Sequence, residues 1–232
     1  MQAVILAGGL GTRLWPLTRT VAKPMVPVAG VPYLEHQLRL LARQSIRDIV
    51  LLTGYLGEQI EKYFGDGARL GVSLRYSREP VPLGTGGALR QARGLLAEDF
   101  LIIYGDSYLP IDYGEVLGTL RALAVAEGLL VVYDNRQGET SVKNNVDLDP
   151  AGFVARYDKK SPHALSYVEA GVLAFRRSVV DRIAAEGAVS LEEEIFPQLI
   201  AARRLIAYVT RQRFYDIGTP ARLEAIESYL AP

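Results

Sequence analysis

Residues 3–14 read AVILAGGLGTRL, a short apolar run followed at once by a loop with three glycines. A continuous apolar run of this length, bounded by glycine, predicts a buried strand over residues 3–6. Glycine lets backbone N–H groups approach an anion closely, and Arg13 and Lys23 bring positive charge to the same place. The first glycine loop, residues 8–14, is therefore predicted to bind phosphate at the carboxyl end of the first strand.

Two better-known phosphate loops are excluded. The dinucleotide fingerprint requires G-x-G-x-x-G, and Leu14 stands where the third glycine would be. The P-loop requires G-x-x-x-x-G-K followed by Ser or Thr, and the sequence contains no such run. For this loop taken alone, a tight turn without a ligand remains the alternative.

Apolar and amphipathic segments alternate along most of the chain. Strands are expected at 3–6, 49–53, 72–76, 101–104, 129–133 and 205–210, a further regular element at 168–175, and helices at 32–43, 58–64, 87–96 and 113–126. Further helices are expected to begin at Ser190, which has capping-box spacing to Glu193, and at Thr219 before Pro220. This rhythm predicts an α/β fold, a Rossmann-like three-layer sandwich with a mainly parallel mixed sheet. Leu34, Leu38 and Leu41 recur at helical spacing and are expected in its core.

Residues 135–167 depart from the alternation of strands and helices. The segment is polar and rich in turn signals, such as Gln137-Gly138 and Asp149-Pro150, which indicate hairpins. We expect a small β insertion in a single domain that spans residues 1–232, because no repeat or flexible linker divides the chain.

The composition excludes several classes of protein. The chain has no cysteine and only two histidines, which excludes disulfides and thiolate metal sites and disfavours a histidine metal centre or a serine triad. Lys plus Arg and Asp plus Glu are balanced at 26 each, so no overall positive field attracts nucleic acid or a membrane surface. With no apolar run long enough to span a bilayer and no signal-peptide pattern, the expected location is the cytoplasm.

Two aspartates are candidate metal ligands. Asp106 follows an apolar strand, and ligands of open parallel sheets gather at the carboxyl ends of the strands. Asp216 sits between a strand and a helix start, with Gly218 close by. Two carboxylates beside a phosphate site suit Mg²⁺, which takes one or two protein carboxylates together with substrate phosphates. The structural alternative is a strand-end cap and a turn residue.

The second glycine loop, residues 83–88, reads LGTGGA and follows the bend at Pro80 and Pro82. Three glycines in four residues let a flat ligand lie against the backbone, whose N–H and C=O groups can bind the edge of a base. A flexible entry to a helix is the alternative.

Taken together, these segments resemble the sugar-1-phosphate nucleotidyltransferases. The resemblance runs from residue 1 to about residue 225 and rests on six motifs in the family's order: Leu6 to Leu14 with Lys23-Pro24, Leu83 to Ala88, Gly105-Asp106, Tyr157 to Lys160, Glu169-Ala170-Gly171, and Asp216 to Pro220. Each motif by itself would be weak evidence, but six in the same order are not.

The resemblance implies roles for individual residues. Arg13, Lys23 and Asp106 would be catalytic, and Asp106 and Asp216 would hold Mg²⁺. The nucleotide would be bound by Leu6, Ala7, Gly8, Gly9, Gly11, Thr12, Gly84, Thr85 and Gly86. The sugar phosphate would be bound by Asn145, Lys160, Glu169 and Gly171. The partners implied are a nucleoside triphosphate and a sugar 1-phosphate.

The sequence departs from the family pattern at two places. Lys159 and Ser161 flank Lys160, where the family usually has Glu and Pro, so either Lys159 or Lys160 could contact the sugar phosphate, with Lys160 aligning better. Asn144-Asn145-Val146 replaces the more frequent Tyr-Gly-Val and leaves the sugar open.

The chain most resembles the short branch with heptose-1-phosphate and mannose-1-phosphate guanylyltransferases, which implies GTP and a heptose or mannose 1-phosphate. The alternatives are uridylyl or thymidylyl transfer to another sugar 1-phosphate, including N-acetylmuramate 1-phosphate, and a non-catalytic regulatory subunit that binds nucleotide sugars. A transferase acting on an alcohol phosphate or a molybdenum cofactor, and a Rossmann dehydrogenase, are disfavoured. The sequence leaves a monomer and a homodimer equally open.

Overall fold

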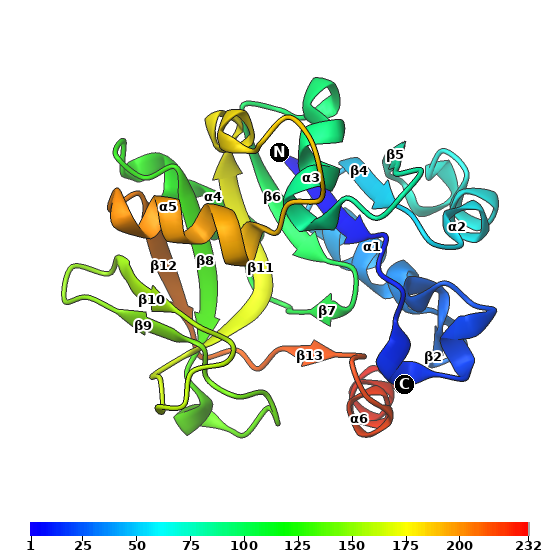
Figure 1. Ribbon diagram of the computed structural model, residues 1–232. Coiled ribbons are helices and arrows are strands. Elements are labelled where there is room, and N and C mark those ends of the chain that lie inside the picture. The colour runs from blue at the N-terminus through cyan, green and yellow to red at the C-terminus, as the bar shows by residue number, and fades with distance from the viewer. Residues whose placement is uncertain (232) are drawn as a thin grey trace.

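The computed structural model describes residues 1–231, whose centre is a seven-stranded sheet (Figure 1). The strand order is β12 (Leu205–Thr210), β8 (Gly128–Tyr133), β11 (Val168–Arg176), β6 (Asp99–Tyr104), β1 (Gln2–Ala7), β4 (Asp48–Thr53) and β5 (Ser73–Arg78). Only β11 runs antiparallel to its neighbours, and the other pairs are parallel. The predicted α/β fold with a mainly parallel mixed sheet is confirmed.

Helices cover both faces of the sheet. The helices are α1 (Tyr33–Arg43), α2 (Gly57–Phe64), α3 (Gly84–Gln91), α4 (Tyr113–Ala122), α5 (Phe196–Ala201) and α6 (Pro220–Leu230). Along β1, Ala3 and Ile5 belong to the core shared with α1, α2, α4 and α6, whereas Val4 belongs to the core shared with α3 and α5. This alternation follows from the two-residue period of a strand and produces three layers. The predicted core leucines of α1 are fully buried.

Two helices differ from their predicted bounds. The helix expected at 87–96 begins at Gly84 and gives way to a 3-10 turn over Arg93–Leu95. It can start among glycines because the carbonyl oxygen of Val189 accepts the N–H groups of Gly86 at 2.8 Å and Gly87 at 3.3 Å, donors that a helix cannot satisfy by itself. The helix expected at 113–126 ends at Ala122, because Leu123 is extended.

The helix expected from Ser190 begins there, but with a π-helical turn over Leu191–Ile195 that leads into α5. Ser190 caps it by accepting the N–H of Glu193 at 3.1 Å. The return bond from the Ser190 N–H goes to Glu194 at 2.9 Å rather than to Glu193. A π-helical turn holds one residue more than an α-helical turn, which accounts for the shift by one position.

Three small antiparallel pairs lie beside the main sheet: β2 (Pro27–Val28) with β3 (Val31–Pro32), β9 (Val146–Leu148) with β10 (Val154–Tyr157), and β7 (Ser107–Tyr108) with β13 (Tyr215–Asp216). The third pair matters for the site, because it brings the segment before α6 against the end of β6 (Figure 1). None of the helices in residues 1–231 combines the length and the apolar character that crossing a bilayer requires.

Candidate active site

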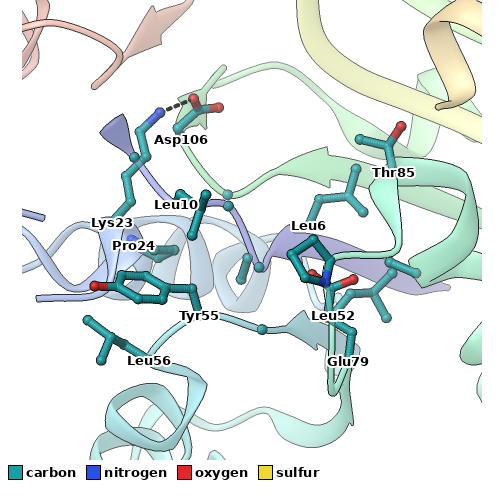
Figure 2. A pocket seen from close by; sticks show the side chains of 18 of the residues that line it. Leu6, Leu10, Lys23, Pro24, Leu52, Tyr55, Leu56, Glu79, Thr85 and Asp106 are labelled. Carbon is teal, nitrogen blue, oxygen red and sulfur yellow. Dashed lines mark hydrogen bonds and ion pairs between the residues drawn. The ribbon is translucent and has the colours of Figure 1, made fainter. Parts of the chain in front are cut away.

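A pocket of about 840 Å³ opens at the carboxyl ends of β1, β4 and β6, where a mainly parallel sheet is expected to bind ligands (Figure 2). Most of the residues assigned to the nucleotide and to catalysis line it: Leu6, Ala7, Gly8, Gly9, Gly11, Thr12, Arg13, Lys23, Gly84, Thr85 and Asp106. Gly86 and Asp216 are not among the lining residues, although Gly218 is. The fold thus brings the two glycine loops and Asp106 to one cavity.

The first glycine loop owes its shape to Gly11, which has a φ of 65°. A Cβ at Gly11 would lie 3.1 Å from side-chain atoms of both Lys23 and Thr18, and the Thr18 hydroxyl donates to the Gly11 carbonyl oxygen at 2.7 Å. The next residues form a 3-10 turn over Thr12–Leu14 that leaves Arg13 exposed at the pocket. Close packing beneath the loop therefore fixes the backbone of the loop, while the guanidinium group of Arg13 stays accessible.

The second glycine loop packs against the segment before the π-helical turn. Gly84 has a φ of 72°, and a Cβ there would lie 2.5 Å from the carbonyl oxygen of Val189. Gly86 meets the same carbonyl oxygen. These two glycines therefore have a packing role, while Gly84 and Thr85 also line the pocket.

Lys23 and Asp106 form an ion pair inside the pocket, drawn as a dashed line in Figure 2. The Lys23 side chain is 12% exposed and that of Asp106 is 26% exposed, so water reaches both only in part. The Ser107 hydroxyl donates to the other Asp106 oxygen at 3.4 Å. The ion pair thus joins a lysine from one segment to a carboxylate from another.

Asp216 lies beside Asp106 because their segments pair. Asp216 stands opposite Ser107 in the register of β13 and β7, and the N–H of Ile217 donates to the Asp106 carbonyl oxygen at 3.0 Å. The Asp216 carboxylate accepts the N–H of Gly218 at 2.7 Å and pairs with Arg222, whose Nη1 is 3.3 Å from each carboxylate oxygen.

The Arg13 side chain also lies close to Gly218, next to Asp216. A Cβ built on Gly218 would meet the Asp216 carboxylate at 2.6 Å and Nη2 of Arg13 at 3.2 Å. Residues 1–231 hold no cluster of three or more His, Cys, Asp or Glu side chains that could bind a metal by themselves. Two carboxylates on paired segments next to the first glycine loop nevertheless fit Mg²⁺, because substrate phosphates would supply further ligands.

Glu169, one of the residues assigned to the sugar phosphate, is a buried carboxylate. Its Oε1 accepts the N–H of Gly171 at 2.7 Å, and its own N–H donates to Oδ1 of Asn145 at 2.8 Å. Burial raises the pKa of Glu169 to about 7; Lys159 opposes this shift and Glu192 adds to it. Glu169 therefore links two other residues assigned to the sugar phosphate, Asn145 and Gly171, by hydrogen bonds.

Gly171 places the residues around Glu169 next to Asp106, one of the two candidate metal ligands. Its φ is 77°, and a Cβ there would collide with the Ser107 hydroxyl, next to Asp106. Only glycine allows β11 to approach β7 this closely.

The neighbouring lysines point to different places. Lys159 Nζ lies 3.4 Å from Oε1 of the pocket-lining Glu192. Lys160 has a side chain that is 90% exposed, and its Nζ is 3.8 Å from the exposed Glu193. Lys159 is thus held beside Glu192, and Lys160, the residue assigned to the sugar phosphate, lies in solvent.

The sequence did not reveal Glu192 as a site residue, since its segment was interpreted only as a helix start. Its carboxylate accepts from Thr85 at 2.7 Å, Tyr104 at 2.9 Å and Ser190 at 3.0 Å. Burial acts to raise the pKa of Glu192, but Lys159 and the hydroxyl groups of Thr85 and Tyr104 hold it below its ordinary value. Contacts between segments this far apart leave no spacing signal in the chain. Glu79, a second pocket carboxylate, was missed for the same reason.

Comparison with known proteins gives one family. The family model described as "Nucleotidyl transferase" matches residues 2–231. The chain is 36% identical over 224 residues to a mannose-1-phosphate guanylyltransferase of Mycobacterium tuberculosis, covering 95% of this chain and 62% of that protein. It is 30% identical over 223 residues to a D-glycero-alpha-D-manno-heptose 1-phosphate guanylyltransferase of Campylobacter jejuni, covering 95% and 96%.

A solved structure shows the same fold. The crystal structure of HddC from Yersinia pseudotuberculosis has a TM-score of 0.84 at 25% identity and covers 98% of each chain, and its complex with GMP-PN has a TM-score of 0.82. The present chain spans about three fifths of the length of the mannose-1-phosphate guanylyltransferases that it matches.

Proposed function

Because the chain belongs to the nucleotidyl transferase family, we propose that it transfers a guanylyl group from GTP to a mannose or heptose 1-phosphate, giving GDP-sugar and pyrophosphate. The observation that supports this most strongly is the convergence of Arg13, Lys23 and Asp106 on one pocket, with Asp216 tied to Asp106 through the backbone. The guanylyltransferase relatives and the GMP-PN complex of HddC favour GTP among the nucleotides.

In the proposed reaction, an oxygen of the sugar phosphate attacks the α-phosphorus of GTP in line. The bond from the α-phosphorus to the bridging oxygen breaks, and pyrophosphate leaves with that electron pair. A sugar phosphate is already ionised at neutral pH, so no general base is needed. The protein then contributes position and charge, as in phosphoryl transfer generally.

The first glycine loop and the charged residues near it would neutralise the negative charge of the reacting phosphates. Backbone N–H groups of this loop would hold the triphosphate, and Arg13 would stabilise the charge that builds on the departing pyrophosphate. Lys23, which forms an ion pair with Asp106, would pair with the reacting phosphates instead. Mg²⁺, held by Asp106 and Asp216, would supply Lewis-acid chemistry and a template for the two substrates.

Other assignments belong to the same proposal. The nucleotide would contact Leu6, Ala7, Gly8, Gly9, Gly11, Thr12, Gly84, Thr85 and Gly86, and the sugar phosphate Asn145, Lys160, Glu169 and Gly171. The protein would act in the cytoplasm as a monomer or homodimer, on small substrates, without nucleic acid or a membrane as partner.

The test is a matrix of nucleoside triphosphates against sugar 1-phosphates, with Mg²⁺ present and pyrophosphate release as the signal. The panel should contain GTP, UTP, dTTP, CTP and ATP against mannose, heptose, glucose and N-acetylmuramate 1-phosphates. We expect GTP with the mannose or heptose substrate to react fastest. Highest activity with UTP or dTTP would replace the guanylyl assignment, and no release in any combination would favour a regulatory binding subunit.

A further inference from the structure

Gln37 is a polar side chain in the buried part of α1. It is 3% exposed and stands in the sequence between Leu34 and Leu38, which are fully buried. Within residues 1–231 its amide oxygen, Oε1, has no hydrogen-bond partner. Burying an unpaired acceptor costs free energy that an apolar side chain would not cost. The N–H groups of this amide must therefore account for glutamine at this position.

These N–H groups hold the turn that carries Asp106. Nε2 of Gln37 donates to the carbonyl oxygen of Tyr104 at 2.9 Å and to that of Ser107 at 2.6 Å. Tyr104 is the last residue of β6 and Ser107 the first of β7, so the two carbonyl groups flank Gly105-Asp106. An amide NH₂ group has two hydrogens and can serve both acceptors at once. Gln37 thus joins both ends of the Asp106 turn, residues 104–107, to α1.

The Asp106 turn has two other anchors, both formed by the backbone. The N–H of Gly105 donates to the carbonyl oxygen of Leu6 at 2.9 Å, and the carbonyl oxygen of Asp106 accepts the N–H of Ile217 at 3.0 Å. Among the side chains of residues 1–231, only that of Gln37 forms hydrogen bonds to the backbone of this turn. The attachment to α1 is therefore the one that a substitution can remove.

Tyr33 stands one helical turn before Gln37 on α1, and it is fully buried. Burial raises the pKa of its hydroxyl well above the ordinary value, and the charges of Asp106 and Asp216 raise it further. The hydroxyl therefore stays protonated in the field of both carboxylates. Neither Tyr33 nor Gln37 neutralises a carboxylate, so the negative charge of the aspartates remains for a cation.

The Asp106 carboxylate has to change partners if it binds Mg²⁺. It forms an ion pair with Lys23, and in the proposed reaction Lys23 pairs with the phosphates while Asp106 holds the metal. Mg²⁺ demands near-ideal octahedral geometry, so a carboxylate that turns from lysine to metal needs a backbone that stays in place. A turn tied to a neighbouring helix meets this need.

We propose that Gln37 is a positioning residue, whose two hydrogen bonds hold the Asp106 turn where the carboxylate can bind the Mg²⁺ of a bound nucleotide. This inference rests on the proposed function, because that function assigns the metal to Asp106. Residues that orient a metal ligand typically contribute about 10- to 100-fold to metal affinity or activity.

The substitution Gln37→Met tests this role, because methionine is unbranched like glutamine and adapts to a buried place, but has no N–H to donate. GTP is titrated calorimetrically into the parent and the variant, once with Mg²⁺ and once with EDTA. The ratio of the two GTP affinities is the Mg²⁺ gain. We expect a gain of at least about tenfold in the parent and of less than about threefold in Gln37→Met. The affinity with EDTA should stay parental, whereas a general loss of structure would lower both affinities.

Gln44→Met is the matched control. Nε2 of Gln44 donates to the carbonyl oxygen of Ile111 at 2.7 Å, and its Oε1 accepts the N–H of Tyr113 at 3.0 Å. The variant thus removes hydrogen bonds of the same kind at the end of the same helix, but none from the Asp106 turn. Its Mg²⁺ gain should equal that of the parent.

Turnover provides a second readout. With Mg²⁺ saturating, Gln37→Met should lower kcat by about 10- to 100-fold and leave KM for the sugar phosphate nearly unchanged. Gln37→Asn keeps the amide but shortens the side chain by one CH₂ group, so it should also reduce the Mg²⁺ gain, and it provides the test if Gln37→Met does not fold.

A parental Mg²⁺ gain in Gln37→Met would overturn the inference, as would an equal loss in Gln44→Met or a parent whose GTP affinity does not depend on Mg²⁺. If Gln37→Met does not fold, a parental gain in Gln37→Asn would overturn it. The titration contains no sugar phosphate. If Gln37→Met loses the gain but the parent reacts with no sugar 1-phosphate, the inference stands and the proposed function fails.

Discussion

The N–H of Ile217 donates to the carbonyl oxygen of Asp106 at 3.0 Å, which ties β13 to β7. This single backbone bond, with the pairing of Asp216 opposite Ser107, brings together two acids from distant parts of the chain. It fixes the backbone positions of Asp106 and Asp216 relative to each other through main-chain structure. A substitution that changes only the charge of a side chain leaves this backbone bond in place.

The substitution Asp106→Asn tests the proposed metal role. It keeps the size of the side chain and leaves the backbone bond to Ile217 in place, so the fold and most nucleotide binding should be retained. Loss of the charge should lower turnover by about 100-fold or more, the scale seen when one electrostatic contact to a transition state is removed. Pyrophosphate release measures the rate, and a titration with GTP measures binding.

Ser107→Ala is a useful control for Asp106→Asn, because it removes the 3.4 Å hydrogen bond to the carboxylate but keeps its charge. It should retain most of the activity. Parental turnover in Asp106→Asn would contradict the metal assignment.

The substitution Arg13→Ala tests whether this guanidinium acts on the triphosphate. Arg13 is exposed at the pocket and lies next to Gly218, without an ion pair in the part of the chain described. If it stabilises charge that develops on pyrophosphate, kcat should fall by about 100-fold, while KM for the sugar phosphate changes far less. Steady-state kinetics with both substrates varied separates the two constants. A raised KM for the sugar phosphate with unchanged kcat would instead assign Arg13 to the sugar side.

The neighbouring lysines can be separated by parallel substitutions. Lys159 is already paired with Glu192, whose side chain is 12% exposed, whereas the side chain of Lys160 is 90% exposed and free to move to a phosphate. Lys160→Ala should therefore raise KM for the sugar phosphate about tenfold and leave KM for GTP nearly unchanged. Lys159→Ala is the comparison, and a larger effect of Lys159→Ala on that KM would show that the phosphate contact belongs to Lys159.

Local patterns in the sequence predict the elements and the loops of this fold. The apolar strands, the leucines of α1 and the cap at Thr219 depend on residues close in the chain, and the structure confirms them. The strand-end position of Asp106 is predictable for the same reason, because a strand brings its last residue to the edge of the sheet.

Contacts between distant segments are not predictable in this way. Glu192 reaches the pocket through hydroxyl groups of Thr85 and Tyr104, and Glu79 occupies space left by Gly8 and Gly54. The early start of α3 also depends on a distant group, the carbonyl oxygen of Val189. Each of these depends on tertiary packing, which leaves no periodicity or spacing in one sequence.

Glu169 predicts a pH dependence of stability that can be measured without any substrate. Burial raises its pKa from the ordinary 4.5 to about 7 in the folded protein. Between these values the folded state holds a proton that the unfolded state has released, so the free energy of unfolding falls as pH rises through this window. The full effect, reached above pH 7, is about 3 kcal/mol. Glu169→Gln has no proton to lose, and its curve should not contain this decrease.

Urea unfolding of the parent and of Glu169→Gln at intervals from about pH 4.5 to 8 measures the difference, and comparison with the variant removes the contributions of all other groups. We expect the parent to lose stability relative to the variant as pH rises, because the carboxylate must then ionise in a buried position. Gln can still accept the N–H of Gly171, which the carboxylate binds at 2.7 Å, so a general loss of structure is not expected. Parallel curves would mean that Lys159 and the Gly171 N–H compensate the buried charge completely, and Glu169 would then be ionised at neutral pH.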